Sequence, residues 1–344
     1  MTDPALREGL LAGKIPALAR AVSIVENARP GFEELLASLH PVLGRGRRIG
    51  ITGPPGAGKS TLTLQLVTAW RAAGLRVAVV AIDPTSPFTG GALLGDRIRM
   101  EAVALDPGVY IRSMATRGSL GGLATSTREV ADLLDAAGFD RIVVETVGVG
   151  QSELDVQRMT DTTVLVLVPE SGDGIQALKS GVMEAADVFV VNKADRPGAP
   201  KVSREIELAL DLRSGRAMRG VGAHHGVRGG RPTEATSSPD PEQWRPPVLL
   251  TVAAKGEGIE PLVTVLDRHW EKTVETGALE SRRRARMAER TRAVVSRSMD
   301  RWLWTDGPAS DLVTARLDAI SRGETSPYDV AAEVMTAVRE GVRV

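Results

Sequence analysis

Short apolar runs alternate with longer stretches of mixed composition through the central part of the chain. The runs lack strict apolar and polar alternation, which is typical of strands buried on both faces of a parallel sheet. The stretches between them, such as 59–73 and 123–137, are predicted to be helices. The predicted strands are residues 47–52, 76–83, 109–114, 141–146, 162–169, 187–193 and 247–253. This order predicts an α/β fold with a mostly parallel, doubly wound sheet.

Helical patterns flank this core. Residues 3–40 predict two or three short helices, the first capped by Asp3 with a proline at its first position. In the C-terminal part, Ser326 and Asp329 have the spacing of a capping box. A stretch rich in Gly, Arg, Ser and Pro at 211–246 predicts a long, mobile surface loop. We therefore divide the chain into an N-terminal helical segment (1–45), an α/β domain (46–258) and a C-terminal helical arm (259–344).

Composition and charge narrow the possible partners and compartments. The 344 residues include 43 Lys+Arg and 43 Asp+Glu, so no net field favours nucleic acid or a membrane, and neither is expected as a partner. The absence of cysteine excludes disulfides, thiolate metal sites and cysteine nucleophiles. The N-terminus lacks the apolar core of a signal peptide, and no segment reaches about 18 uninterrupted apolar residues. We expect a cytoplasmic protein.

The sharpest motif is GPPGAGKS at 53–60, which follows a predicted strand and precedes a predicted helix. It fits the P-loop pattern of Gly, four free positions, Gly, Lys and Ser or Thr. Glycines let backbone N–H groups surround phosphates, and the helix N-terminus adds a positive dipole end. Lys59 supplies a cation for the β- and γ-phosphates, and the Ser60 hydroxyl is a ligand for Mg²⁺. The predicted phosphate-binding residues are Gly53, Pro54, Pro55, Gly56, Ala57, Gly58, Lys59, Ser60 and Thr61.

Two further segments predict which base is bound. NKAD at 192–195 fits an ordinary strand-to-helix turn, but after a P-loop it indicates guanine recognition. The Asp195 carboxylate can accept hydrogen bonds from guanine N1 and its exocyclic amine, a donor pattern that adenine does not present. AAKGEG at 253–258 then occupies the place of the loop that holds guanine O6. We predict GTP and GDP as ligands, bound through Asn192, Lys193, Asp195, Ala253, Ala254 and Lys255.

The hydrolytic residues follow a less regular pattern. Where Asp-x-x-Gly is expected after the fourth strand, the chain reads ETVGVGQSE, with Glu145 as the acid and Gly148 near the γ-phosphate. Asp83 ends a predicted strand, and Asp96 lies in a glycine-flanked loop. A strand-end cap for Asp83 and a solvated or capping carboxylate for Asp96 remain alternatives. With Ser60, these three carboxylates suit a Mg²⁺ shell and a group that orients water. Lys59 joins the three carboxylates in the predicted catalytic set.

At these residues the sequence resembles the MeaB/ArgK family of methylmalonyl-CoA mutase-associated GTPases. The resemblance implies a homodimeric P-loop GTPase that hydrolyses GTP slowly alone and acts as chaperone to an adenosylcobalamin-dependent acyl-CoA mutase. In that family the nucleotide state gates loading of intact cofactor and removal of damaged cofactor. The matching segments, in order between residues 49 and 195, are IGITGPPGAGKSTL, DPTSPFTGGALLGDRIRM, ETVGVGQSE, VPESGDGIQALKSG and NKAD.

The resemblance also implies switch residues, and the sequence departs from the family's pattern at two places. Arg99 falls in the family's first mobile loop, and Asp173 and Lys179 fall in its additional switch. Lys179 is also counted among the predicted catalytic residues. A helix-start acid and a solvated lysine are the plainer interpretations of this pair. The loop at 211–246 is longer than the family's pattern, and Ala253 stands where a serine is usual.

Two other functions use a similar P-loop. A metallochaperone GTPase needs a store of histidine and cysteine, which this chain lacks. A kinase of the transport-kinase type would use ATP, against which the NKAD motif argues. The arginine-rich stretch 281–292 fits either a basic patch for a polyanion or acidic partner, or a solvated or dimer-contacting helix face.

Overall fold

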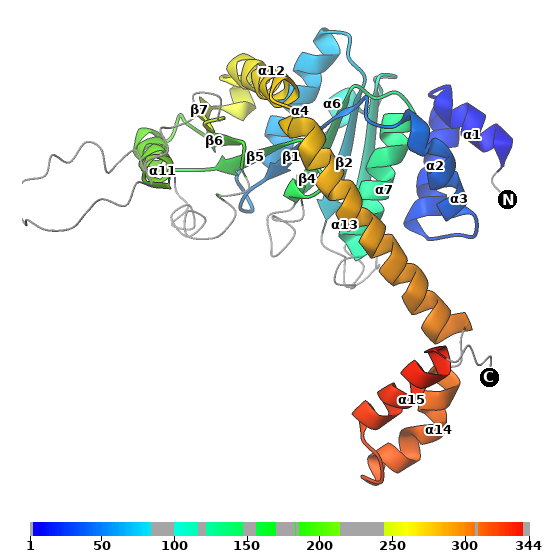
Figure 1. Cartoon of the computed structure of the whole chain (residues 1–344). Helices are drawn as coiled ribbons and strands as arrows, with labels where there is room; N and C mark the ends of the chain where they lie inside the picture. Colours follow the sequence, from blue (N-terminus) through cyan, green and yellow to red (C-terminus); the bar gives the residue numbers. More distant parts are fainter. Residues whose placement is uncertain are drawn as a thin grey trace, which may run out of the picture. The chain divides into compact units, whose positions relative to one another are not determined.

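In the computed structural model, the chain forms an α/β domain followed by further helices (Figure 1). The structure describes residues 3–83, 100–115, 122–146, 156–169, 183, 186–213, 244–306 and 309–339. Its contacts divide the chain into two units, Met1–Leu279 and Glu280–Val344. The first unit thus joins the N-terminal helices, the sheet and the helix that follows it.

The first unit is built on a seven-stranded sheet in the order β3-β2-β4-β1-β5-β6-β7. Every strand pair is parallel, which confirms the predicted sheet. Each predicted strand is present, although β2, β5, β6 and β7 are shorter than predicted and β3 is one residue longer. The strands are β1 (Arg47–Thr52), β2 (Val77–Asp83), β3 (Val109–Ala115), β4 (Arg141–Thr146), β5 (Thr162–Leu167), β6 (Val188–Asn192) and β7 (Val248–Thr251).

Helices cover both faces of the sheet because alternate side chains of each buried strand point to opposite faces. On one face, Val79 belongs to the same apolar cluster as Leu62 of α4 and Leu262 of α12. On the other face, Val80 packs in a cluster with Leu133 of α7 and with the N-terminal helices. The helices of the first face are α4 (Lys59–Ala72), α6 (Glu101–Ala104) and α12 (Ile259–Glu275).

The second face carries the N-terminal helices beside α7, and α11 over β5 and β6. The predicted cap at Asp3 is present, since its carboxylate accepts a hydrogen bond from the Ala5 N–H at 3.1 Å. The predicted surface loop at 211–246 falls mostly outside the described residues, which stop at Arg213 and resume at Trp244. The helices are α1 (Pro4–Leu11), α2 (Ile15–Glu26), α3 (Phe32–Leu39), η1 (His40–Val42), α7 (Gly122–Ala136) and α11 (Ala199–Arg213).

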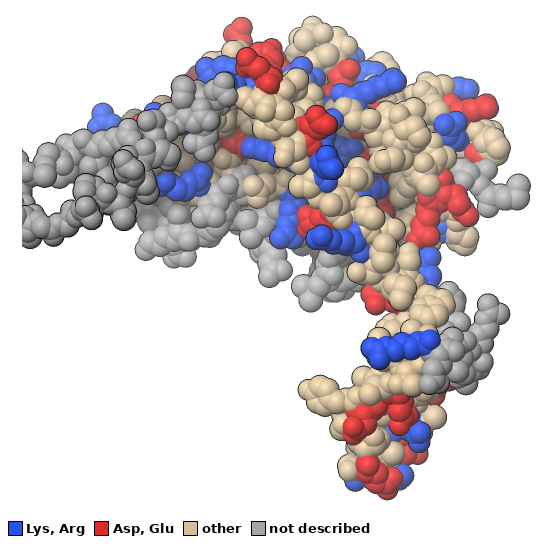
Figure 2. All heavy atoms as spheres, viewed as in Figure 1, with Lys and Arg blue, Asp and Glu red and all other residues tan. Residues whose placement is uncertain are grey.

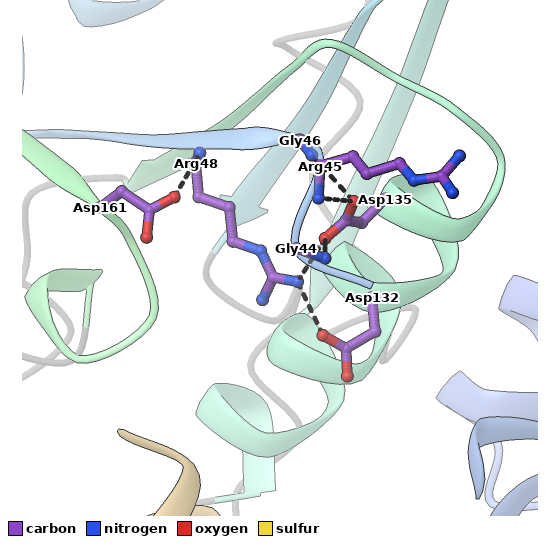
Figure 3. A network of polar contacts seen from close by, with 7 residues as sticks. All are labelled: Gly44, Arg45, Gly46, Arg48, Asp132, Asp135 and Asp161. Carbon is purple, nitrogen blue, oxygen red and sulfur yellow. Dashed lines mark hydrogen bonds and ion pairs between the residues drawn. The ribbon is translucent and has the colours of Figure 1, made fainter. Parts of the chain in front are cut away.

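A buried ionic network joins α7 to the segment that leads into β1 (Figure 3). The Asp135 carboxylate accepts the backbone N–H groups of residues 44–46 at 2.7, 3.1 and 2.8 Å. Arg48 of β1 donates to Asp132 at 2.8 Å, and its own N–H donates to Asp161 at 3.1 Å. Burial opposes the charge of Arg48, but Asp132 and Asp135 outweigh it and raise the Arg48 pKa above its usual value. The network therefore fastens the start of β1 to α7.

The second unit consists, in its described part, of helices and a turn at residues 322–326. Helix α13 begins two residues before the unit boundary and buries none of its residues. The predicted capping box before α15 is confirmed, because the Asp329 N–H donates to Ser326 Oγ at 3.2 Å and the Ser326 N–H donates to Asp329 Oδ2 at 3.0 Å. The elements are α13 (Ala278–Arg301), the π-helical turn η4 (Trp302–Asp306), α14 (Ala309–Ser321) and α15 (Pro327–Arg339).

The surface carries charges of both signs. Figure 2 shows acidic and basic side chains interspersed over the described part of the viewed face, in keeping with the equal totals of the sequence. None of the helices that the structure describes is both long and apolar enough to cross a membrane.

Candidate nucleotide-binding site

The predicted site residues that the structure describes lie at the carboxyl edge of the sheet, around β1. The P-loop follows the end of β1, and β1 lies between β4 and β5. The direction in which strands are added reverses at β1: β2, β3 and β4 lie on one side of it, and β5, β6 and β7 lie on the other. Open parallel sheets bind their ligands at such a reversal. The described ends of β4, β6 and β7 contribute the remaining groups at this edge.

Two glycines of the P-loop cannot be replaced without moving the loop. Gly53 has φ 138°, and a Cβ there would lie 2.1 Å from the Val166 carbonyl oxygen. Gly58 has φ 87°, and its Cβ would lie 2.4 Å from the Asn192 amide nitrogen. Both positions combine a left-handed backbone with a close approach, which only glycine accepts. The loop thus reaches the N-terminus of α4 in the tight path that the motif predicted.

Two lysine ammonium groups lie against the P-loop. Lys59, the first residue of α4, is buried, and its Nζ donates to the carbonyls of Gly53 at 2.8 Å and Pro54 at 2.9 Å. Lys193 donates from Nζ to the carbonyl of Gly56 at 2.8 Å. Lys193 also has φ 56°, a left-handed backbone that residues other than glycine rarely adopt. The loop that is predicted to bind phosphate therefore has cationic groups from two separate motifs.

Asn192 connects the two base-binding segments to the P-loop. Its buried amide donates to the carbonyl of Ala57 at 2.8 Å. Its oxygen accepts from the Thr251 hydroxyl at 3.0 Å and from the Ala253 N–H at 3.1 Å. The sequence predicted Asn192 and Ala253 as binding residues, but it did not indicate Thr251 or this linkage.

The predicted guanine-binding carboxylate has a lysine partner. Asp195 Oδ2 lies 3.3 Å from Lys255 Nζ, and both side chains are exposed. Lys255 belongs to the short helix η3 (Ala253–Lys255) that follows β7. The structure thus brings Asp195 and Lys255, predicted from separate motifs, into contact, and Ala254 lies between Ala253 and Lys255 in the same turn.

A buried carboxylate lies beside the first turn of α4. Glu145 of β4 is 4% exposed. Its Oε1 accepts the Ser60 hydroxyl at 2.6 Å, and its Oε2 accepts the Thr63 hydroxyl at 2.8 Å. Ser60 and Glu145 are hard oxygen donors of the type that Mg²⁺ prefers, and Mg²⁺ is commonly held by one or two protein groups together with nucleotide phosphates. These two residues fit a Mg²⁺ site, in which the ion would balance phosphate charge.

Several predicted residues cannot be placed. Asp83 ends β2, which β4 separates from β1, but the described structure does not include its side chain. Within the described residues, no three His, Asp or Glu side chains gather to hold a metal ion. The predicted residues outside the description are Asp96, Arg99, Gly148, Asp173 and Lys179.

Comparison with known proteins finds a matching family and named relatives. The family described as methylmalonyl Co-A mutase-associated GTPase MeaB matches residues 18–307. A Pyrococcus abyssi protein named as a GTPase is 48% identical over 291 residues, covering 85% of this chain and 83% of the relative. The mouse protein named methylmalonic aciduria type A homolog, mitochondrial, is 35% identical over 295 residues, covering 81% of this chain and 65% of the relative.

A solved structure has a similar fold over nearly the whole chain. A crystal structure described as an LAO/AO transport system kinase is similar with a TM-score of 0.64 and 26% identity, and the match covers 98% of this chain and 99% of that one. The P-loop, the NKAD segment and the parallel sheet define the class of P-loop GTPases. Within this class, the chain belongs to the MeaB family, and it is a GTPase.

Proposed function

We propose that the chain uses GTP binding and hydrolysis to act as chaperone for an adenosylcobalamin-dependent acyl-CoA mutase of the methylmalonyl-CoA mutase type. Its nucleotide state would gate cofactor loading, protection and reactivation of the mutase. Family membership carries the proposal, because the family is described by its association with that mutase. The mouse relative, named for methylmalonic aciduria, supports the same assignment.

The residues at the carboxyl edge have proposed roles in this cycle. Lys59 and the backbone of 53–60 would bind the phosphates, and Asp195 with the 253–255 turn would select guanine. Ser60 would hold Mg²⁺ with Glu145, joined by Asp83 and Asp96, and these acids would also orient the attacking water. Gly148 would lie near the γ-phosphate. The buried position of Ser60 and Glu145 supports the part of this set that the structure describes.

We also propose that the chain is a homodimer that pairs through its C-terminal arm. Helix α13 buries none of its residues, although it carries apolar side chains. Large apolar groups on α13 and η4 are 40–56% exposed in the single chain, and contact with a second copy would remove them from water. These groups are Met287, Val295, Met299, Trp302 and Trp304.

GTP turnover measured with and without purified candidate mutases tests the chaperone role. We expect one mutase to raise the turnover of the wild-type protein. The Lys59→Ala variant should lose tight GTP binding, because the ammonium that lies against the P-loop is removed. If Lys179 belongs to the partner-sensing switch with Arg99 and Asp173, Lys179→Ala should bind GTP normally and lose the stimulation. Turnover that no mutase changes would contradict the chaperone role.

A transport-type kinase is the second candidate, because the similar solved structure is described as one. A kinase of this type would bind ATP, whereas the Asp195 carboxylate matches the donors of guanine. Calorimetric titration with GTP and with ATP separates the two, and preference for ATP would favour the kinase.

A further inference from the structure

Thr63 is a buried residue of the site that no motif includes. It lies on α4 one turn after Ser60 and is 0% exposed. Its hydroxyl donates to Glu145 Oε2 at 2.8 Å. Because residues three apart share a helix face, Ser60 and Thr63 present two hydroxyls side by side to one carboxylate. The two oxygens of Glu145 are therefore each held by a different hydroxyl of the same helix.

Holding both oxygens determines the orientation of the carboxylate. The terminal torsion of a glutamate is broad, so hydrogen bonds to the carboxylate oxygens limit how far its plane can rotate. The second bond, from Thr63, restricts that rotation. Charge-assisted hydrogen bonds of this kind are the stronger ones in proteins.

The orientation of Glu145 in turn decides how Ser60 uses its hydroxyl. A hydroxyl has one proton and two acceptor lone pairs. Ser60 gives its proton to Glu145 Oε1 at 2.6 Å, so toward a cation its oxygen would present a lone pair and not the proton. If Glu145 rotated away, the Ser60 proton could turn toward the position of the cation and oppose its binding.

We propose that Thr63 is a positioning residue that holds Glu145 so that the Ser60 hydroxyl is presented as a ligand for Mg²⁺. The inference rests on the proposed Mg²⁺ role of Ser60 and Glu145 and is independent of the mutase partner. A merely structural Thr63 would affect the stability of the protein, whereas a positioning residue changes the Mg²⁺ dependence of nucleotide binding.

Calorimetric binding of GDP and of a non-hydrolysable GTP analogue, measured in a Mg²⁺ titration and in EDTA, tests the proposal. Thr63→Val keeps the shape of the side chain and removes its donor. We expect about tenfold weaker apparent Mg²⁺ affinity, the loss associated with one hydrogen bond to a charged group, with unchanged affinity in EDTA. Thr63→Ser restores the donor and should restore the Mg²⁺ affinity. If the valine variant does not fold, Thr63→Ala serves in its place.

Two further variants separate the possible outcomes. Thr68→Val, on the exposed face of the same helix, should match the wild-type protein. Ser60→Ala should lose most of the Mg²⁺ dependence, and its full retention would overturn the metal site itself. If Ser60→Ala loses this dependence while Thr63→Val keeps it, the positioning role is overturned. The positioning role is overturned as well if Thr63→Val lowers the nucleotide affinity equally in Mg²⁺ and in EDTA.

Discussion

The Asn192 side chain joins the P-loop to the end of β7 and its following turn, which lie far from the P-loop in the sequence. One buried amide contacts the P-loop, the end of β7 and the turn that follows it. An amide suits this position because it has donors on one side and an acceptor on the other. A carboxylate would lack the donor to Ala57, so the residue type follows from the geometry.

Substituting Asn192 should affect both stability and binding. Asn192→Ala leaves the buried Ala57 carbonyl and the Ala253 N–H without this partner, and we expect a loss of about 3 kcal/mol in the free energy of unfolding. GTP affinity should fall as well, because the base-binding turn is no longer tied to the P-loop. Urea unfolding and calorimetry measure the two effects. The exposed Asn27→Ala is the control, and equal stability of both variants would contradict the expectation.

The predicted residues that the structure brings together here are those whose chemistry requires a fixed local pattern. The P-loop glycines, Lys59 and Ser60 occur at set spacings, so a single segment reveals them. Thr63 and Thr251 could not be found this way, because their partners Glu145 and Asn192 come from distant segments. A threonine in a helix or strand carries no local sign of such a partner.

Helix α7 and the entry to β1 depend on each other through Asp135. Its carboxylate is 1% exposed and accepts three consecutive backbone N–H groups. Three donors converging on one carboxylate make a short connection rigid without regular secondary structure. The N-terminal helices that precede residue 44 also pack on α7. The contact of Asp135 with residues 44–46 therefore lies where the N-terminal helices lead into the sheet.

Removing that carboxylate should loosen the connection. We expect Asp135→Ala to lower the free energy of unfolding by about 3 kcal/mol, because a buried partner of both Arg48 and the backbone is lost. Cleavage by a protease near residues 40–46 should become faster at the same time. The control is Asp318→Ala, on the exposed surface of α14. Unchanged unfolding and proteolysis would show that the contact is dispensable.

Strand positions followed from the apolar runs, whereas the ends of β5 and β7 were each predicted two residues too far along the chain. The prediction continued β5 to residue 169, but the strand ends at Leu167, and Pro169 has no N–H for a ladder. It continued β7 to residue 253, but the strand ends at Thr251, because the Ala253 N–H donates to Asn192 instead of to a neighbouring strand. A pattern of apolar residues does not show whether a backbone N–H will bond to a distant side chain instead of to a neighbouring strand.

At the scale of the whole molecule, the contacts separate residues 1–279 from the rest. We expect a chain that ends at Leu279 to fold and to bind GTP as the full chain does, because the sheet and the described site residues belong to this unit. Sedimentation should give a dimer for the full chain and a monomer for the shortened one, if the C-terminal arm is the dimer contact. A monomeric full chain, or a dimeric shortened chain, would contradict that assignment.

The sequence predicted the architecture of this molecule more completely than its associations. Periodicity and the P-loop spacing come from the chain's own folding and chemistry, so they are present in one sequence. Partner choice depends on a surface shared with another protein. The proposed switch residues Arg99, Asp173 and Lys179 rest on resemblance alone and remain predictions.

The central position of β1 has a consequence for biosynthesis. Its described neighbours, β4 and β5, begin at Arg141 and Thr162, long after β1 ends at Thr52. At about 5–20 residues added per second, a ribosome would leave this apolar strand without a neighbour for roughly 5–20 s. During that interval the nascent chain exposes the strand that leads into the P-loop. We expect chaperones that act on nascent chains to bind at this strand, and aggregation to start from it if none binds.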